Sequence, residues 1–239
     1  MIRGTASAQF GSDALGGSVQ FLTNVPALGV AGAAALHGTV TLGGETGHQG
    51  GMGAVLLGYS RDRLALSGSL SARKTGDYRP GGGVDSHSAI TRFLGLPSDT
   101  FLDQRMPETG FQQRAGQLRF NWAANPDLLV VASYIRSRQD NANGWDQILG
   151  GDGNLISELN DLQLDLGYLR LERLDAGWFD RASATYSFNI QREERVNQGG
   201  NGNPNATIGH EPERTTVHGV QFNASRALST RHSLYTLQF

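Results

Sequence analysis

Apolar and polar side chains alternate with a period of two along most of this chain, from about residue 35 onward. A strand points successive side chains to opposite faces, so this alternation predicts β-strands with one apolar and one polar face. The clearest runs cover residues 36–43, 64–73, 117–122, 182–191 and 217–225. The chain is therefore predicted to be all-β, with about nine antiparallel strands joined in sequence order.

Two segments alternate imperfectly. Residues 128–135 are apolar on both faces, so their pattern does not say which face is the more buried one. The segment 162–171 carries its leucines on one face up to Leu166 and on the other face from Leu169. Either a β-bulge or the end of a membrane-facing band would produce that switch, and the sequence leaves both explanations open.

The connections between the predicted strands also form a pattern. Short connections are expected at residues 45–49, 62–63, 125–127, 175–180 and 228–230, and long polar ones at residues 76–113, 141–160 and 196–214. Transmembrane β-barrels combine short periplasmic turns with longer extracellular loops in this way. The connections favour such a barrel, although a soluble β-sandwich has the same alternation along its strands.

Aromatic side chains stand beside the predicted short turns. Trp122, Trp178 and Phe179 occupy these positions, and aromatic residues mark the water–lipid boundary of membrane barrels. We predict that the three residues lie at one membrane interface. The alternative is ordinary edge packing of a soluble sheet.

Composition narrows the class of protein. The chain of 239 residues has 33 glycines, no cysteine, 18% charged residues and a net charge of −2. Disulfides and thiolate metal sites are excluded, and the charge argues against a nucleic-acid partner. No apolar run reaches the ~20 residues of a transmembrane helix, and the N-terminus lacks the pattern of a signal peptide. An exported protein with this sequence would need an export signal upstream of it.

Residues 3–23 form the most specific motif of the chain. The segment reads Arg-Gly-Thr-Ala-Ser-Ala-Gln-Phe-Gly-Ser-Asp-Ala-Leu-Gly-Gly-Ser-Val-Gln-Phe-Leu-Thr. It resembles the end of the plug domain of TonB-dependent receptors, with an aromatic-Gly-Ser step, a Gly-Gly pair and a strand that ends in Thr. The matching residues are Arg3, Gly4, Ser7, Phe10, Gly11, Ser12, Ala14, Gly16, Gly17 and Thr23. Thr5, where the family has proline, and Gln9, Ser18 and Gln20 depart from the pattern.

The resemblance implies a domain layout. Residues 1–26 would be the C-terminal end of a plug domain, 27–34 a linker, and 35–239 the N-terminal part of a transmembrane antiparallel β-barrel. Receptors of this family close a barrel of about 22 strands around the plug. The TonB-contacting box and most of the plug would then lie outside this chain, which alone is not expected to close a barrel or transport anything.

Few residues suggest chemistry. No nucleophile motif, metal-ligand spacing or cofactor site is recognisable, so we predict no enzyme activity, no cofactor and no metal site. The best candidates for ligand contact are residues of the long connections, because arginines there can bind anionic groups through paired hydrogen bonds. These candidates are Arg79, His87, Arg92, Arg105 and Trp145. Residue by residue, solvated loop charges are the simpler interpretation.

The resemblance implies active uptake of a scarce nutrient across the outer membrane of a Gram-negative bacterium. The ligand would be an iron–siderophore, haem, cobalamin or a similar small molecule, and the partners would be outer-membrane lipid and the TonB complex. The alternative is a passive porin or a soluble adhesive β-domain. The plug-end motif separates the first possibility from a porin, which needs no plug.

Overall fold

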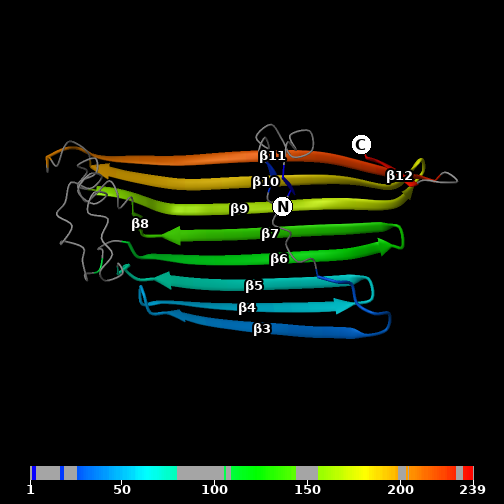
Figure 1. Ribbon diagram of the computed structural model, residues 1–239, viewed down its shortest axis with the longest axis horizontal. Helices are drawn as coiled ribbons and strands as arrows, with labels where there is room; N and C mark the ends of the chain where they lie inside the picture. The colour runs from blue at the N-terminus through cyan, green and yellow to red at the C-terminus, as the bar shows by residue number, and fades with distance from the viewer. Residues whose placement is uncertain are drawn as a thin grey trace.

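The computed structural model of the protein describes residues 2–3, 17–18, 26–79, 105, 109–143, 156–198, 203, 205–229 and 234–238. Within these residues all regular secondary structure is β-strand (Figure 1). The strands are β1 (Ile2–Arg3), β2 (Gly17–Ser18), β3 (Ala34–Glu45), β4 (Gly50–Arg61), β5 (Leu64–Thr75), β6 (Phe111–Asn125), β7 (Leu128–Asp140), β8 (Ala142–Asn143), β9 (Ile156–Ala176), β10 (Phe179–Gln198), β11 (Ile208–Ser229) and β12 (Leu234–Gln238).

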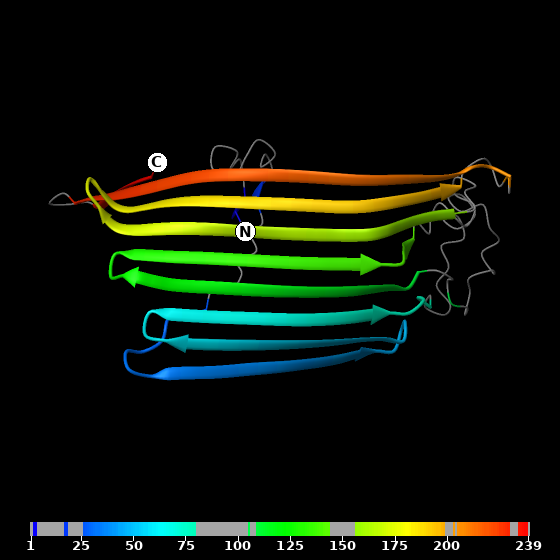
Figure 2. The ribbon, with the colours of Figure 1, turned by 180° about the vertical axis from the view of Figure 1, so that it is seen from behind.

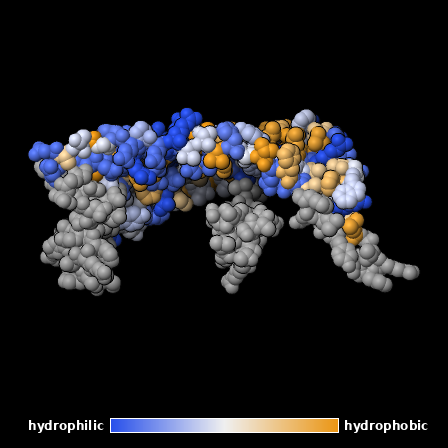
Figure 3. Space-filling model, turned by 90° about the horizontal axis from the view of Figure 1, so that it is seen from above, coloured by the Kyte–Doolittle hydropathy of each residue, from blue (hydrophilic) through white to orange (hydrophobic). Residues whose placement is uncertain are grey.

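One large antiparallel sheet dominates the structure. Nine strands follow one another in the order β12-β11-β10-β9-β7-β6-β5-β4-β3, and the short β8 pairs with β9 beside that path. Strands adjacent in the chain are thus adjacent in the sheet, as predicted for an up-and-down barrel wall. Among the described residues, β3 and β12 each pair with a single neighbour. The sheet is bowed rather than flat, as the view along its edge shows (Figure 3).

The two-residue turns β4–β5, β6–β7 and β9–β10 lie at one end of the sheet, the turn end (Figures 1 and 2). The β4–β5 turn is Asp62-Arg63, and Asp62 takes a left-handed backbone conformation with φ 41°. The β9–β10 turn is Gly177-Trp178, where Gly177 has φ 69°, a conformation that glycine adopts without steric cost. The opposite end, the loop end, carries the β3–β4 turn and the long connections.

Successive turns are staggered along the strands. Leu64, the first residue of β5, pairs with Trp122, and β6 continues three residues beyond it to Asn125. Leu128, the first residue of β7, pairs with Arg173, and β9 again continues three residues to Ala176. Each turn is therefore displaced by ~10 Å along the strand direction relative to the preceding turn. The two turns are two strands apart, which is ~10 Å across the sheet. A rim through these turns makes about 45° with the strand direction, close to the strand tilt of closed barrels.

The register gives the sheet two chemically different faces. Leu36, Tyr59, Leu66, Phe120, Ala132, Leu169, Tyr186 and Val220 are cross-strand partners in one row. Their face, the apolar face, also carries the row through Leu57, Leu118 and Tyr134. The adjacent row, on the opposite or polar face, contains His37, Ser67, Arg119, Ser133 and Ser187.

The usual pattern of burial is inverted, because apolar side chains are exposed on one face and polar side chains are buried on the other. On the apolar face Leu36 is 78% exposed, Leu118 64% and Val220 67%. The buried polar residues of the described chain include Arg119, Asn121, Ser133 and Ser183, all on the polar face, whereas the buried hydrophobic ones are only Ala65, Val131 and Val196. The sheet therefore has no water-excluded apolar core of its own among the described residues.

The two ambiguous segments are resolved by the register. In β7, Leu128, Val130, Ala132 and Tyr134 belong to the apolar face. β9 pairs with β7 without a shift from Leu162 to Arg173, so no bulge causes its change of phase. Leu164 and Leu166 lie on the polar face near the loop end, and Leu169 and Leu171 on the apolar face near the turn end. The bulge lies further along, where Arg192 and Glu194 of β10 face Gln163 and Asn160.

Several predicted connections are too long, and β6 begins at Phe111, within the predicted connection 76–113. β9 begins at Ile156 rather than after Asn160, and the β9–β10 turn has two residues rather than the six of 175–180. β10 and β11 pair as far as Gln198 and Ile208, within the segment 196–214 that was predicted to be a loop. Cross-strand polar contacts such as His210 Nδ1 to Glu194 Oε1, 3.0 Å, support strand pairing there without apolar alternation.

Candidate functional site: the polar face and the loop-end rim

The polar face carries a row of buried hydrogen-bonding side chains on its central strands. Arg119 and Asn121 of β6 are 7% and 4% exposed, and Ser133 of β7 is 8% exposed. These residues occupy alternate positions of strands whose other positions are apolar, which is why they share one face. Buried polar groups require hydrogen-bond partners, so this face is suited to contact a polar body rather than a lipid chain.

The segment that precedes β3 lies on this face. Asn121 Nδ2 donates to the backbone oxygen of Pro26 over 2.7 Å, across 95 residues of sequence. Gly29 runs so close to Arg61 that a Cβ atom at position 29 would stand 2.7 Å from its Cα. The backbone N–H of Gly32 donates to Asp62 Oδ1 at 2.5 Å. Three contacts thus hold residues 26–32 to the sheet near the turn end.

Near the turn end the polar face also carries a charge cluster. Glu172 lies between two arginines, with its Oε2 2.5 Å from Arg170 Nη2 and its Oε1 3.1 Å from Arg181 Nε. The Glu172 side chain is 13% exposed, and the arginines are 40% and 58% exposed. One carboxylate therefore neutralises one guanidinium and leaves a positive charge on this part of the face.

At the loop end, side chains hold the two ends of the 76–110 connection together. Asp77 Oδ1 accepts the backbone N–H of Gly110 at 3.0 Å, and Thr109 Oγ1 accepts that of Tyr78 at 2.8 Å. The Arg105 guanidinium donates to the backbone oxygen of Asp77 at 2.7 Å. These bonds join residues about 30 positions apart and give the long connection a narrow, fixed base.

The β3–β4 turn packs against that base. Glu45 Oε2 lies 2.6 Å from His48 Nε2, and Glu45 Oε1 lies 3.5 Å from Arg73 Nη2 of β5. The His48 ring is 4.9 Å from the Tyr78 ring, and the Arg73 guanidinium is 5.7 Å from the Phe111 ring. We call these residues, with Asp77, Arg79, Arg105 and Thr109, the loop-end rim. Its arginines and aromatic rings offer hydrogen-bond donors and stacking surfaces to a ligand.

The structure brings together two of the predicted ligand-contact residues. Arg79 and Arg105 both belong to the rim, whereas His87, Arg92 and Trp145 lie outside the described residues. Of the plug motif, Arg3 and Gly17 are paired with each other in β1 and β2, and Gly4, Ser7, Gly11, Ser12 and Gly16 lie outside the described residues. Ligand contact and plug packing remain predictions for all of them.

The predicted interface aromatics share the turn end. Trp122 lies on the apolar face of β6 and is 45% exposed. Trp178 is 56% exposed in the β9–β10 turn, and Phe179 begins β10 with its ring 5.1 Å from the Trp178 ring. Arg226 of β11 lies 4.5 Å from the Trp178 ring and donates to its backbone oxygen at 2.8 Å. Their place at a membrane interface stays a prediction.

Sequence reasoning missed Glu45, His48, Asp77, Arg170 and Glu172. The available signal was weak, because each is a single ionisable residue outside any recognisable motif. Asp77 is 33 positions from its partner Gly110, and Arg181 reaches Glu172 only through the pairing of β9 with β10.

The described ranges contain no group of three or more His, Asp, Glu or Cys side chains that could hold a metal ion. No helix in the same ranges is long and apolar enough to cross a membrane.

Comparison with known proteins gives matches in structure. No protein-family model and no curated protein matches the chain in sequence. A mutant of the ferric enterobactin receptor PfeA from Pseudomonas aeruginosa, solved in complex with enterobactin, superposes with a TM-score of 0.57 at 14% identity, covering 95% of this chain and 33% of the receptor. The ferric enterobactin receptor PfeA in complex with BCV-L6 gives a TM-score of 0.55 at 17% identity, covering 96% and 33%.

The chain thus spans about a third of the length of these solved receptors. Identities of 14% and 17% show a common fold. The predicted all-β class and antiparallel barrel wall of about nine strands are confirmed.

Proposed function

We propose that this chain is part of a TonB-dependent outer-membrane receptor that imports a small nutrient, with a ferric siderophore as the favoured ligand class. The observation that carries the proposal is the inverted sheet, with an exposed apolar face and a buried polar face, in the fold of a siderophore receptor. The activity would be binding and transport, without covalent chemistry.

The inverted burial supports a membrane location. On β5 the apolar face runs from Leu64 to Leu70, about 20 Å at ~3.4 Å per residue, and it continues across the neighbouring strands. Outer-membrane barrels present an apolar band of ~25 Å to lipid. A soluble adhesive β-domain would have to leave this whole band in water, where exposed apolar patches of that size favour association.

The segment before β3 supports a plugged receptor over a passive porin. Residues 3–23 resemble the end of a plug, and the contacts of Pro26, Gly29 and Gly32 hold the following residues to the polar face. A barrel wall with a polar inner face can accommodate such a domain through hydrogen bonds. In an open porin the same face would line a water-filled channel.

The loop-end rim supports an anionic ligand. Arg79 is exposed, and Arg105 is held by a backbone hydrogen bond that leaves other donors of its guanidinium available. A ferric chelate with anionic oxygens would accept from such donors. One solved structure of this fold is a ferric enterobactin receptor in complex with enterobactin, and we extend that class of ligand to this chain.

Uptake measurements test the proposal. A receptor that contains this chain is produced in a Gram-negative host that lacks its own siderophore receptors, and uptake of radiolabelled ferric enterobactin and other ferric siderophores is measured with and without TonB. We expect TonB-dependent uptake of at least one chelate. Entry of small sugars that is independent of TonB, without uptake of any chelate, would establish a passive porin instead.

A pair of variants localises the ligand site. Replacing Arg79 and Arg105 together by Gln is expected to weaken binding of the imported chelate about tenfold, the loss of one or two charge-assisted hydrogen bonds. Arg63→Gln is the matched control, because Arg63 is an exposed arginine in the β4–β5 turn at the opposite end of the sheet. Equal losses in both variants would contradict a site at the rim.

A further inference from the structure

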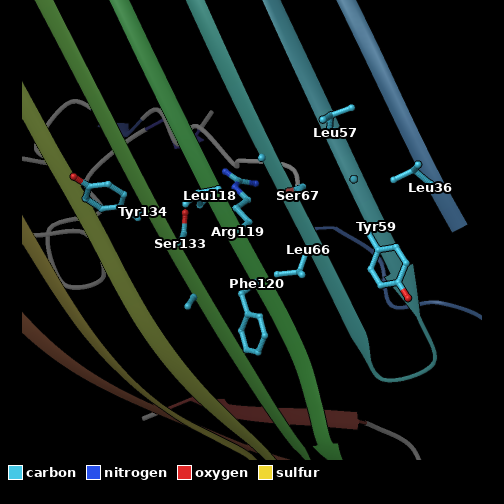
Figure 4. A pocket seen from close by; sticks show the side chains of 13 residues that line it. Leu36, Leu57, Tyr59, Leu66, Ser67, Leu118, Arg119, Phe120, Ser133 and Tyr134 are labelled. Carbon is cyan, nitrogen blue, oxygen red and sulfur yellow. The ribbon is translucent and has the colours of Figure 1, made fainter. Parts of the chain in front are cut away.

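β3 is the least buried of the long strands. Eleven of its twelve residues are exposed, and only Gly43 is half-buried. On the apolar face Leu36 borders a hollow of about 540 Å³ beside Leu57 and Leu66 (Figure 4). Within the described residues β3 pairs with β4 alone. Its attachment therefore depends mainly on the hydrogen bonds of one ladder, and regions with so few buried contacts open locally at low free energy.

The segment before β3 does not leave the sheet at this exposed strand. It crosses the polar face near the turn end, over β4 and β5, and is bonded to β6 at Pro26 (Figures 1 and 2). Three spacings of ~4.8 Å between neighbouring strands make this path ~14 Å long across the sheet. We call residues 26–32 the tether.

The two ends of the tether are bonded to different parts of the sheet. The backbone oxygen of Pro26 accepts from Asn121 Nδ2 of β6 at 2.7 Å, and the backbone N–H of Gly32 donates to Asp62 Oδ1 of the β4–β5 turn at 2.5 Å. Between these bonds Gly29 passes so close to the end of β4 that a Cβ atom there would collide with its backbone. Gly32 has φ 79°, a conformation that glycine adopts without steric cost. The path of the tether is therefore fixed at three points.

The sheet is well buried where the tether is attached to it. Ala65 of β5 is 0% exposed, and its cross-strand partner Asn121 is 4% exposed. Val131 of β7, the next residue of the same row, is 9% exposed. Two of the three buried hydrophobic side chains of the described chain thus lie in the row to which the tether is bonded. This row is a firmer attachment point than β3, because buried contacts raise the free energy of local opening.

We propose that the tether stops displacement of the segment before Pro26 at β6 and so keeps β3 in the sheet. The inference rests on the proposed function, in which that segment belongs to a plug that is displaced during import. A load from upstream acts first on the Asn121 bond and on the close contact of Gly29. It reaches β3 only after these have broken. In a closed barrel, loss of β3 would open the wall and leave backbone groups unpaired in lipid.

Single-molecule force spectroscopy tests this on a receptor that contains this chain, held in a lipid bilayer and pulled by its N-terminus. We expect the upstream segment to extend first and β3 to leave the sheet in a separate, later event. The double variant Asn121→Asp, Asp62→Gly loses both bonds, because aspartate has no amide donor and glycine has no carboxylate. In this variant β3 should leave together with the upstream segment, which adds about 70 Å of contour length to that event for residues 26–45.

Asp62→Asn is the matched control. Asparagine keeps an acceptor oxygen for Gly32 and tolerates the positive φ of Asp62, 41°. Like the glycine variant, it removes the negative charge that lies 3.6 Å from Arg61. The two events should therefore stay separate in this control. Joint release of β3 in the unmodified receptor, or separate release in the double variant, would overturn the inference.

Amide exchange without load shows whether the bonds bear a load or stabilise β3 itself. The β3–β4 ladder is unchanged in the double variant, so exchange within β3 should match that of the unmodified receptor. Faster exchange throughout β3 would mean that the bonds stabilise the strand directly, and the tether would then be rejected.

Failure of this inference is distinguishable from failure of the proposed function. If the receptor takes up a chelate with TonB but releases β3 together with the upstream segment, only the tether is wrong. If β3 is released separately but no chelate is taken up, the tether holds and the transport function is wrong. If the receptor is not recovered in outer membranes, the premise and the inference fail together.

Discussion

The apolar and polar faces belong to the same strands, but the side chains of the apolar face are exposed and many of those of the polar face are buried. Leu36 and Leu118 on one face are 78% and 64% exposed, whereas Arg119 and Asn121 on the other are 7% and 4% exposed. In a protein surrounded by water the hydrophobic effect would drive the reverse arrangement. The difference teaches that the two faces suit opposite environments, and it supports the membrane location proposed above.

Charging the apolar face is expected to have the largest effect. Leu118→Arg places a guanidinium near the centre of the band and should destabilise the membrane-inserted protein by about 2–4 kcal/mol. Ser71→Arg is the control, because Ser71 is an exposed residue of the polar face, and we expect a change within about 0.5 kcal/mol. Urea unfolding in lipid vesicles measures both. Equal effects would mean that the two faces have the same environment.

Breaking the polar-face charge cluster is expected to have the next largest effect. Glu172→Ala leaves Arg170 and Arg181 without their shared carboxylate, and we expect a loss of about 1–3 kcal/mol in the free energy of unfolding. The control is Glu193→Ala, since Glu193 pairs with one exposed arginine, Arg195, and such pairs contribute less than ~1 kcal/mol. A neutral result at position 172 would show that the polar face is as well hydrated as an ordinary surface.

The alternation of side chains was sufficient to predict the two faces and the strand order. In β5 and β6 each apolar residue recurs at every second position, so phase and face follow directly. The pattern was insufficient in β9, where leucines occupy the polar face near the loop end and the apolar face near the turn end. Periodicity reports that a face is apolar, but it does not report what covers that face.

Two further features depend on contacts that are distant in sequence. The strand extensions at 196–198 and 208–214 are mostly polar, and their pairing follows from the β10–β11 register rather than from propensity. The bond from Asn121 to Pro26 joins residues 95 positions apart. The rim residues Arg79 and Arg105 were predicted as ligand contacts, but the bonds of Asp77 that organise the base of the connection were not.

Removing the bond between the polar face and the preceding segment should have a local effect. Asn121→Asp keeps the size of the side chain but replaces the donor of the Pro26 bond with an acceptor, so the bond is lost at a cost of about 1–2 kcal/mol. We expect faster amide exchange at residues 27–33, with unchanged exchange in the strands. Asn223→Asp is the control, because Asn223 uses only its oxygen, as acceptor from Gln221. Uniformly faster exchange across the sheet would indicate global destabilisation instead.

The smallest effect is expected where the apolar face meets the turn end. Trp178→Leu removes the contact with the Arg226 guanidinium, 4.5 Å from the ring, and should cost about 0.5–1 kcal/mol because the site is exposed. Trp178→Phe keeps an aromatic face and should cost less. If the turn end lies at a membrane interface, brominated lipids will quench the fluorescence of both Trp122 and Trp178, and quenching will fall in the Trp178 variants. Absence of quenching in the unmodified protein would place the turn end in water and contradict the prediction that these aromatic residues lie at a membrane interface.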